Sequence, residues 1–116
     1  MNLTIWHNNL CSTSRKALDY LENLGYKITI RPYLTEPPSE TELEEVLKKL
    51  GENATYILRK KDKVFLEKFA DINLSSKEWI KAMHNNPSMI ERPIVISKDK
   101  AWLARPFDKW VEEFEV

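Results

Sequence analysis

The order of apolar segments at the start of the chain limits the possible folds more than any other feature. Residues 3–6 form a short apolar run with β-branched members, and the polar residues after it indicate a strand that enters a loop. From Ser12 the apolar residues recur at helical spacing until Gly25, and apolar and polar residues then alternate over 26–30. Two strands joined through a helix lie parallel with a right-handed crossover, so the chain is predicted to begin with a β-α-β unit.

Two capping-box patterns predict helices in the middle of the chain. Ser39 with Glu42, and Ser75 with Glu78, have the spacing at which a serine and a glutamate together cap the first turn of a helix. A helix is therefore expected to follow each serine. Between these two helices, residues 54–70 combine scattered apolar residues with a charged stretch, which favours short helical or irregular pieces.

The last part of the sequence completes the predicted fold. Residues 94–96 and 101–104 are apolar and flank a short polar link, which predicts a β-hairpin, and Pro106 suits the first turn of a final helix. A thioredoxin-like α/β fold with a small mixed sheet and a helical insertion satisfies this order of elements. We expect one domain over 1–116, with the insertion at about 39–86.

The charge composition excludes several kinds of partner. Eighteen Lys and Arg balance eighteen Asp and Glu, so no strong net field favours nucleic acid or an anionic membrane surface. No apolar run approaches the roughly 20 residues that span a bilayer, and the first residues do not resemble a secretory signal. One cysteine and two separated histidines lack the spacing of metal ligands. We expect a cytoplasmic protein without a metal, a nucleic-acid partner or a membrane partner.

The single cysteine, Cys11, lies where the first predicted strand leads into the first predicted helix. Unpaired backbone N–H groups and the positive end of the helix dipole favour thiolate over thiol at such a position. The four following side chains supply hydroxyls and a cation: Ser12, Thr13, Ser14 and Arg15. His7 precedes them on the same connection and can add a hydrogen bond or positive charge. A buried, inert cysteine is the plainer interpretation, but this position favours a reactive thiol that binds or attacks an anion.

The nine residues HNNLCSTSR at 7–15 are the most specific motif in the sequence. They resemble the active-site pattern H-N-P-x-C-x-[TS]-S-R of the ArsC-type, glutaredoxin-coupled arsenate reductases. The chain differs from that pattern at Asn9, where the family has proline, and at Ser12, where a glycine is common. Later segments resemble the same family in the same order: Tyr33-Leu34 with Pro37-Pro38-Ser39, Leu58-Arg59-Lys60, Arg92-Pro93-Ile94-Val95, and Leu103-Ala104-Arg105-Pro106.

The resemblance implies a cysteine that attacks arsenate or a similar oxyanion. The matching positions give Cys11 as the nucleophile, His7 as its helper, and three arginines as oxyanion ligands, Arg59, Arg92 and Arg105. Planar guanidinium groups also suit the several acceptor oxygens of a tetrahedral oxyanion. The family scheme needs no bound cofactor, because glutathione is the co-substrate and glutaredoxin is the partner that recycles the cysteine.

Two other functions remain open from the sequence. An Spx-like regulator would use the same fold to bind RNA polymerase without catalysis, although such regulators resemble C-x-x-C and the second position here is Ser14. A general thiol-exchange protein would act on glutathionylated partners, and it would have no need of three arginines around the cysteine.

Overall fold

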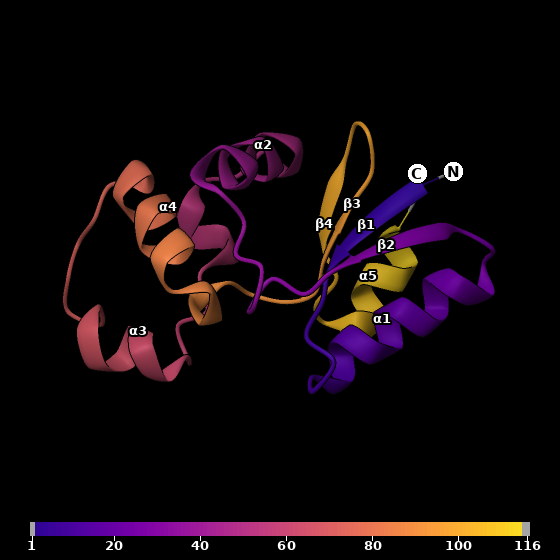
Figure 1. Cartoon of the computed structure of the whole chain (residues 1–116), viewed down its shortest axis with the longest axis horizontal. Helices are drawn as coiled ribbons and strands as arrows, with labels where there is room; N and C mark the ends of the chain where they lie inside the picture. Colours follow the sequence, from indigo (N-terminus) through magenta and orange to yellow (C-terminus); the bar gives the residue numbers. More distant parts are fainter. Residues whose placement is uncertain (1, 115–116) are drawn as a thin grey trace. The chain divides into compact units, whose positions relative to one another are not determined.

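The computed structural model describes residues 2–114, and the chain divides into two compact units. The first unit joins the two ends of the chain, Met1–Glu36 and Arg92–Val116. The second is the intervening segment Pro37–Glu91. Figure 1 labels the helices and strands of each unit.

The first unit is built on a mixed four-stranded sheet with the order β2-β1-β3-β4. Its strands are β1 (Asn2–Trp6), β2 (Lys27–Arg31), β3 (Ile94–Ile96) and β4 (Ala101–Leu103). β1 pairs in parallel with β2 and antiparallel with β3, and β3 and β4 form the antiparallel hairpin. This sheet confirms the predicted β-α-β start and the thioredoxin-like arrangement with a late hairpin.

Two helices lie along one face of this sheet, as Figure 1 shows: α1 (Ser12–Asn23) and α5 (Phe107–Glu113). They bury a common apolar core with the strands, formed by Leu3, Ile5, Ala17, Leu21, Val95, Ala104 and Trp110. Burial of this set removes apolar surface from water and fixes the helices on the sheet. The prediction for Pro106 is corrected slightly. It is the N-cap residue of α5 rather than part of its first turn, because the helix begins at Phe107.

The second unit is helical. Its elements are α2 (Glu40–Leu50), the 3-10 helix η1 (Ala54–Ile57), α3 (Lys63–Lys68), α4 (Ser76–Asn85) and the 3-10 helix η2 (Pro87–Met89). Both predicted capping boxes are present, at Ser39 with Glu42 and at Ser75 with Glu78. The short η1 and α3 confirm the prediction of short helical pieces between the two longer helices. Phe65 stacks on Trp79 with ring centroids 5.9 Å apart, which fixes α3 against α4.

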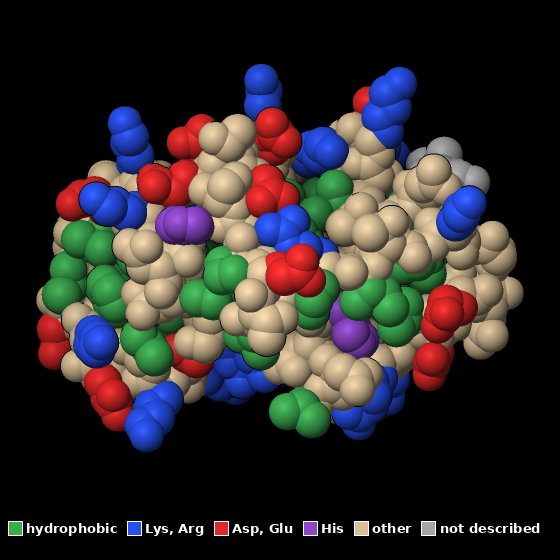
Figure 2. Space-filling view, in the orientation of Figure 1, with side chains coloured by type: hydrophobic (Ala, Val, Ile, Leu, Met, Phe, Trp, Pro, Cys, Tyr) green, Lys and Arg blue, Asp and Glu red, His purple; other side chains and the backbone are tan. Residues whose placement is uncertain are grey.

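Surface charge and helix length agree with the composition. Basic and acidic side chains are interspersed over the face shown in Figure 2. None of the helices within residues 2–114 is long and apolar enough to cross a membrane. Across the same residues, no group of three His, Cys, Asp or Glu side chains gathers as metal ligands would.

Candidate active site

The loop between β1 and α1 holds Cys11 through a set of local hydrogen bonds. The Cys11 backbone N–H donates to the carbonyl of Asn8 at 3.0 Å, and the side-chain oxygen of Asn8 accepts from the backbone N–H of Leu10 at 3.0 Å. Arg15, one turn into α1, donates from Nη1 to the carbonyl of Asn9 at 2.8 Å. Asparagine is well suited to such turns, because its short side chain can bond to the nearby backbone. The loop therefore presents Cys11 in a fixed backbone conformation.

Cys11 is the N-cap residue of α1, and its side chain makes no capping bond to the helix. The backbone N–H groups of the first turn have no partners inside a helix, and the helix dipole is positive at this end. A half-buried sulfur here lies in a field that favours the anion. The local geometry is thus that of a thiolate site.

The sheet topology brings two arginines from the distant end of the sequence to this loop. Antiparallel pairing of Trp6 with Ile94 places the end of β1 beside the start of β3. Pairing of Ile94 with Leu103 places the end of β4 beside that same point. Arg92 lies two residues before this meeting point and Arg105 two residues after it, so both arise next to the loop that carries the cysteine.

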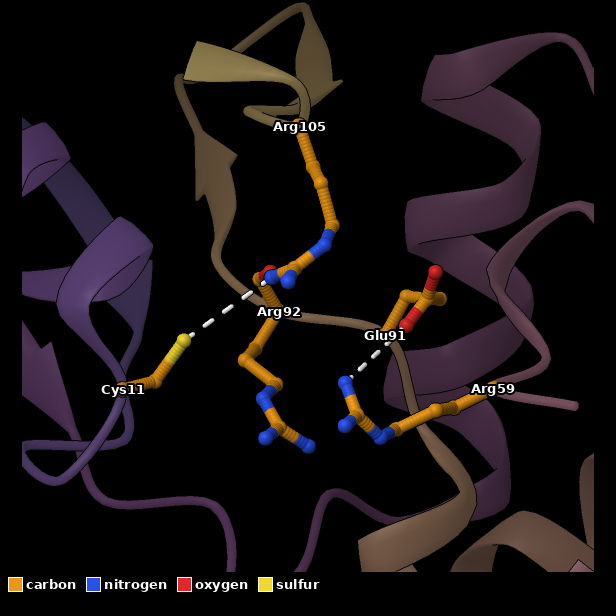
Figure 3. A network of polar contacts seen from close by, with 5 residues as sticks. All are labelled: Cys11, Arg59, Glu91, Arg92 and Arg105. Atoms are coloured by element: carbon orange, nitrogen blue, oxygen red, sulfur yellow. Dashed lines mark hydrogen bonds and ion pairs between the residues drawn. The ribbon is translucent and has the colours of Figure 1, made fainter. Parts of the chain in front are cut away.

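The contact of Arg105 with Cys11 is direct. Arg105 Nη1 is 3.8 Å from Cys11 Sγ, and the same nitrogen donates to the carbonyl of Arg92 at 2.9 Å, so the guanidinium is anchored while it faces the sulfur (Figure 3). The Arg92–Pro93 and Arg105–Pro106 peptide bonds are both cis. Nε of Arg92 is buried without a hydrogen-bond partner among the described residues. An oxygen-rich anion bound near the sulfur would supply an acceptor for such a group.

Nearby hydrogen-bond donors outweigh desolvation in setting the pKa of the Cys11 thiol. Partial burial is the largest single influence and raises the pKa of the thiol. Four nearby donors act the other way, in decreasing order of effect: the backbone N–H of Ser14, the side chain of Arg92, the side chain of Arg105 and the hydroxyl of Ser14. Among them, Arg105 is within hydrogen-bond distance of the sulfur. Together the four donors lower the pKa of Cys11 from its ordinary value to about 6. The thiol is therefore mostly ionised at neutral pH, where an ordinary cysteine is mostly protonated.

This pKa gives a measurable pH profile. The rate of alkylation of Cys11 by iodoacetamide is expected to rise with pH around an apparent pKa of about 6 and to level off above pH 7. The single cysteine makes the assay specific without further substitution. The unfolded protein in denaturant is the matched control, and its profile should follow the ordinary thiol pKa of roughly 8.5. An unperturbed value in the folded protein would contradict the thiolate site.

Arg59, the third arginine predicted for the site, belongs to the second unit. Its Nη1 forms an ion pair with Oε1 of Glu91 at 3.6 Å (Figure 3), and its backbone N–H donates to the carbonyl of Met89 at 2.7 Å. Both partners in the ion pair are about one quarter exposed. Whether Arg59 joins Cys11 in one site stays a prediction.

His7 is buried at the end of β1, with 6% of its surface exposed. Its Nε2 lies 3.5 Å from Oδ1 of Asn9, and its Nδ1 has no hydrogen-bond partner among residues 2–114. Over that same range no hydrogen bond joins His7 to Cys11. The geometry therefore gives His7 an unused ring nitrogen within the loop, and its catalytic role stays a prediction.

The sequence and the fold that carry this site are shared with known proteins. A sequence model of the ArsC family matches residues 6–114. The chain belongs to the ArsC family. It is 41% identical to an arsenate reductase of Haemophilus influenzae, over 91% of this chain and 93% of that protein. It is 37% identical to an arsenate reductase of Neisseria meningitidis, over 91% and 92% of the two chains. An arsenate reductase structure from Vibrio cholerae superposes with a TM-score of 0.89 at 35% identity, covering 98% of each chain.

Some features of this ArsC-family site lie beyond what the sequence predicted. The loop bonds of Asn8 and Asn9 were not expected, although two adjacent asparagines after a strand are a recognisable signal for a turn. The pairing of Arg59 with Glu91 joins residues far apart in the sequence, and no spacing pattern indicates it. Of the predicted loop hydroxyls, only that of Ser14 is among the donors that lower the pKa of Cys11, and it is buried without a hydrogen-bond partner among the described residues.

Proposed function

We propose that this protein is an arsenate reductase-like thiol oxidoreductase, in which Cys11 reduces an arsenate-type oxyanion with electrons from glutathione. The observation that carries the proposal is the guanidinium of Arg105, 3.8 Å from a sulfur whose pKa is lowered to about 6. The same cation that stabilises the thiolate is placed to hold an oxyanion against it. The arsenate reductases among the relatives support arsenate as the substrate.

The reaction proceeds by nucleophilic catalysis in two bond exchanges. The Cys11 thiolate attacks arsenic, and one arsenate hydroxyl takes a proton from solvent and leaves as water. A sulfur–arsenic(V) bond thus replaces one arsenic–oxygen bond. Glutathione thiolate then attacks the Cys11 sulfur. The sulfur–arsenic bond breaks, and its electron pair stays on arsenic, which leaves in the trivalent state. Cys11 then carries a mixed disulfide with glutathione. Glutaredoxin takes up the glutathionyl group and regenerates the Cys11 thiolate, so one cysteine in this chain is sufficient.

The remaining predicted residues support this chemistry. Arg92 and Arg105 bind the oxyanion, and the first turn of α1 with Ser12, Thr13 and Ser14 supplies the positive end of the helix. Guanidinium donors aimed at the charge that develops on oxygen lower the barrier most when they are held in place beforehand.

Three further residues complete the proposed site, and the roles of His7 and Arg59 are those that the family resemblance implies. Arg15 holds the loop through the carbonyl of Asn9. His7 assists the attack of Cys11, and Arg59 completes the set of three arginines.

The cellular setting follows from the chemistry. A lone reactive thiol that depends on glutathione belongs in a reducing compartment, and we assign the protein to the cytoplasm. We also propose that both units act as one ArsC-type domain over residues 1–116, with no bound cofactor, no metal, and no membrane or nucleic-acid partner.

The Spx-like alternative is not favoured. The arsenate reductases at 37–41% identity and the ArsC-family match point to an oxidoreductase rather than to a regulator that binds RNA polymerase. A general thiol-exchange protein also fits the site less well, because two guanidinium groups beside the sulfur are suited to an oxyanion.

Turnover of arsenate tests the proposal. Purified protein with arsenate, glutathione and glutaredoxin should form arsenite, with oxidised glutathione appearing in the ratio required by a two-electron reduction. Omission of arsenate or glutathione should stop the reaction, and omission of glutaredoxin should stop it after one cycle. Phosphate added together with arsenate should inhibit, and phosphate alone should not be reduced. Arsenite formed at the same rate without the protein, or none formed with it, would overturn the proposed activity.

A further inference from the structure

An exposed leucine lies beside the reactive cysteine. Leu10 is 89% exposed, the largest exposed fraction among the large hydrophobic side chains of the described residues. It directly precedes Cys11, and its backbone N–H is bound by the side chain of Asn8. Arg15 fixes the preceding carbonyl, that of Asn9. A single exposed leucine is common on protein surfaces. This one belongs to a loop held by backbone hydrogen bonds, on the residue directly before the reactive cysteine.

Because the chain has a single cysteine, a second molecule must approach the loop that carries Leu10 and Cys11. Once Cys11 carries a disulfide, no second cysteine in the chain can resolve it, so a thiol from another molecule must reach the Cys11 side. That thiol comes either from glutathione, which is small and charged, or from a protein. A protein thiol brings surrounding surface with it, and the centre of a protein interface is formed by apolar side chains.

We propose that Leu10 is the apolar docking contact for glutaredoxin when it reduces the Cys11 mixed disulfide. The inference rests on the proposed function, because it takes the glutathionylated Cys11 of that scheme as its starting state. Encounters between redox proteins bury little surface, so one exposed apolar side chain on the residue before the reacting cysteine can make a large share of the contact. Two exposed cations, Arg15 and Lys16, lie near the start of α1, and Arg15 contacts the loop through the carbonyl of Asn9. They favour a partner with acidic groups around its own apolar surface.

The step that Leu10 assists is a balanced thiol–disulfide exchange. The glutaredoxin thiolate attacks the glutathionyl sulfur, and a new disulfide forms between glutaredoxin and glutathione. The bond to Cys11 breaks, and its electron pair stays on the Cys11 sulfur as thiolate. The low pKa of Cys11 makes its thiolate a good leaving group in this exchange.

The test starts from the preformed disulfide and contains no arsenate. Wild-type protein, Leu10→Ala, Leu10→Met and Leu24→Ala are glutathionylated at Cys11 with oxidised glutathione. Release of the glutathionyl group is then timed with glutaredoxin or, separately, with dithiothreitol. Leu24 is the matched control, because it is 53% exposed at the other end of α1, about 20 Å along the helix. Failure of arsenate turnover would leave this measurement readable, so the two proposals fail separately.

Leu10→Ala is expected to lower kcat/KM for glutaredoxin about tenfold, as loss of a central apolar contact does, with no change in the dithiothreitol rate. Leu10→Met should restore most of the glutaredoxin rate, and Leu24→Ala should match the wild type. An equal loss with glutaredoxin in Leu10→Ala and Leu24→Ala would overturn the docking role. A parallel loss with dithiothreitol would also overturn it, because Leu10 would then act on the reactivity of Cys11.

Discussion

Replacement of Cys11 by serine is expected to abolish arsenate reduction, with a loss of more than about a thousandfold in turnover. Serine keeps nearly the same shape, but its hydroxyl is protonated at neutral pH. Its oxygen also cannot form the disulfide with glutathione whose formation reduces arsenic. Because Cys11 makes no capping bond to α1, the substitution should leave the helix intact. Arsenite formation with glutathione and glutaredoxin measures the loss directly.

The control for Cys11→Ser is anion binding by the same protein. The arginines remain in place, so the variant should still bind arsenate or phosphate, as calorimetry can show. Its thermal unfolding should remain cooperative. A turnover rate of the variant within tenfold of the wild-type rate would contradict the covalent mechanism, even if arsenate is the true substrate.

Replacement of Arg105 by alanine is the second large effect. Arg105 donates toward the Cys11 sulfur, so its loss raises the pKa of the thiol and reduces the thiolate present at neutral pH. It also removes one guanidinium from the oxyanion, a contact worth about a hundredfold or more in comparable sites. We expect kcat/KM for arsenate to fall by about a hundredfold at pH 7, with a smaller deficit at pH 9, where Cys11 is ionised in both proteins.

Arg105→Lys separates charge from geometry. Lysine retains the positive charge but lacks the planar fork, so it should recover much of the thiolate while binding the oxyanion poorly. The alkylation pKa should then lie nearer the wild-type value than in Arg105→Ala, while KM for arsenate stays high. If Arg105→Ala has the wild-type alkylation pKa and the wild-type kcat/KM, the role of the 3.8 Å contact is refuted.

Local signals in the sequence account for the elements that were predicted well. The two capping boxes depend on residues three apart, so Ser39 and Ser75 could be recognised as helix starts from their spacing to a glutamate alone. The β-α-β unit and the hairpin followed from periodicity and turn residues. Pro106 was misplaced by one position, because a proline is accepted both at the helix cap and just inside it.

The electrostatics of the site depend on longer-range packing. Arg92 and Arg105 were named from a family resemblance, but their approach to Cys11 results from the pairing of β1, β3 and β4, which spacing alone does not reveal. Sequence spacing likewise gives no indication of the ion pair between Arg59 and Glu91. The position of Cys11 before a helix predicts that its pKa is lowered. The size of the shift depends on donors that only the folded chain brings together.

The intact mass of the protein after a single reaction cycle tests the central claim most directly. Wild-type protein is mixed with arsenate and glutathione in the absence of glutaredoxin, quenched in acid and measured by mass spectrometry. The scheme predicts one added glutathionyl group, located on Cys11, that appears only when arsenate is present and disappears when glutaredoxin is added. An unmodified protein that has nevertheless formed arsenite, or a glutathionyl group that appears equally without arsenate, would contradict reduction through Cys11.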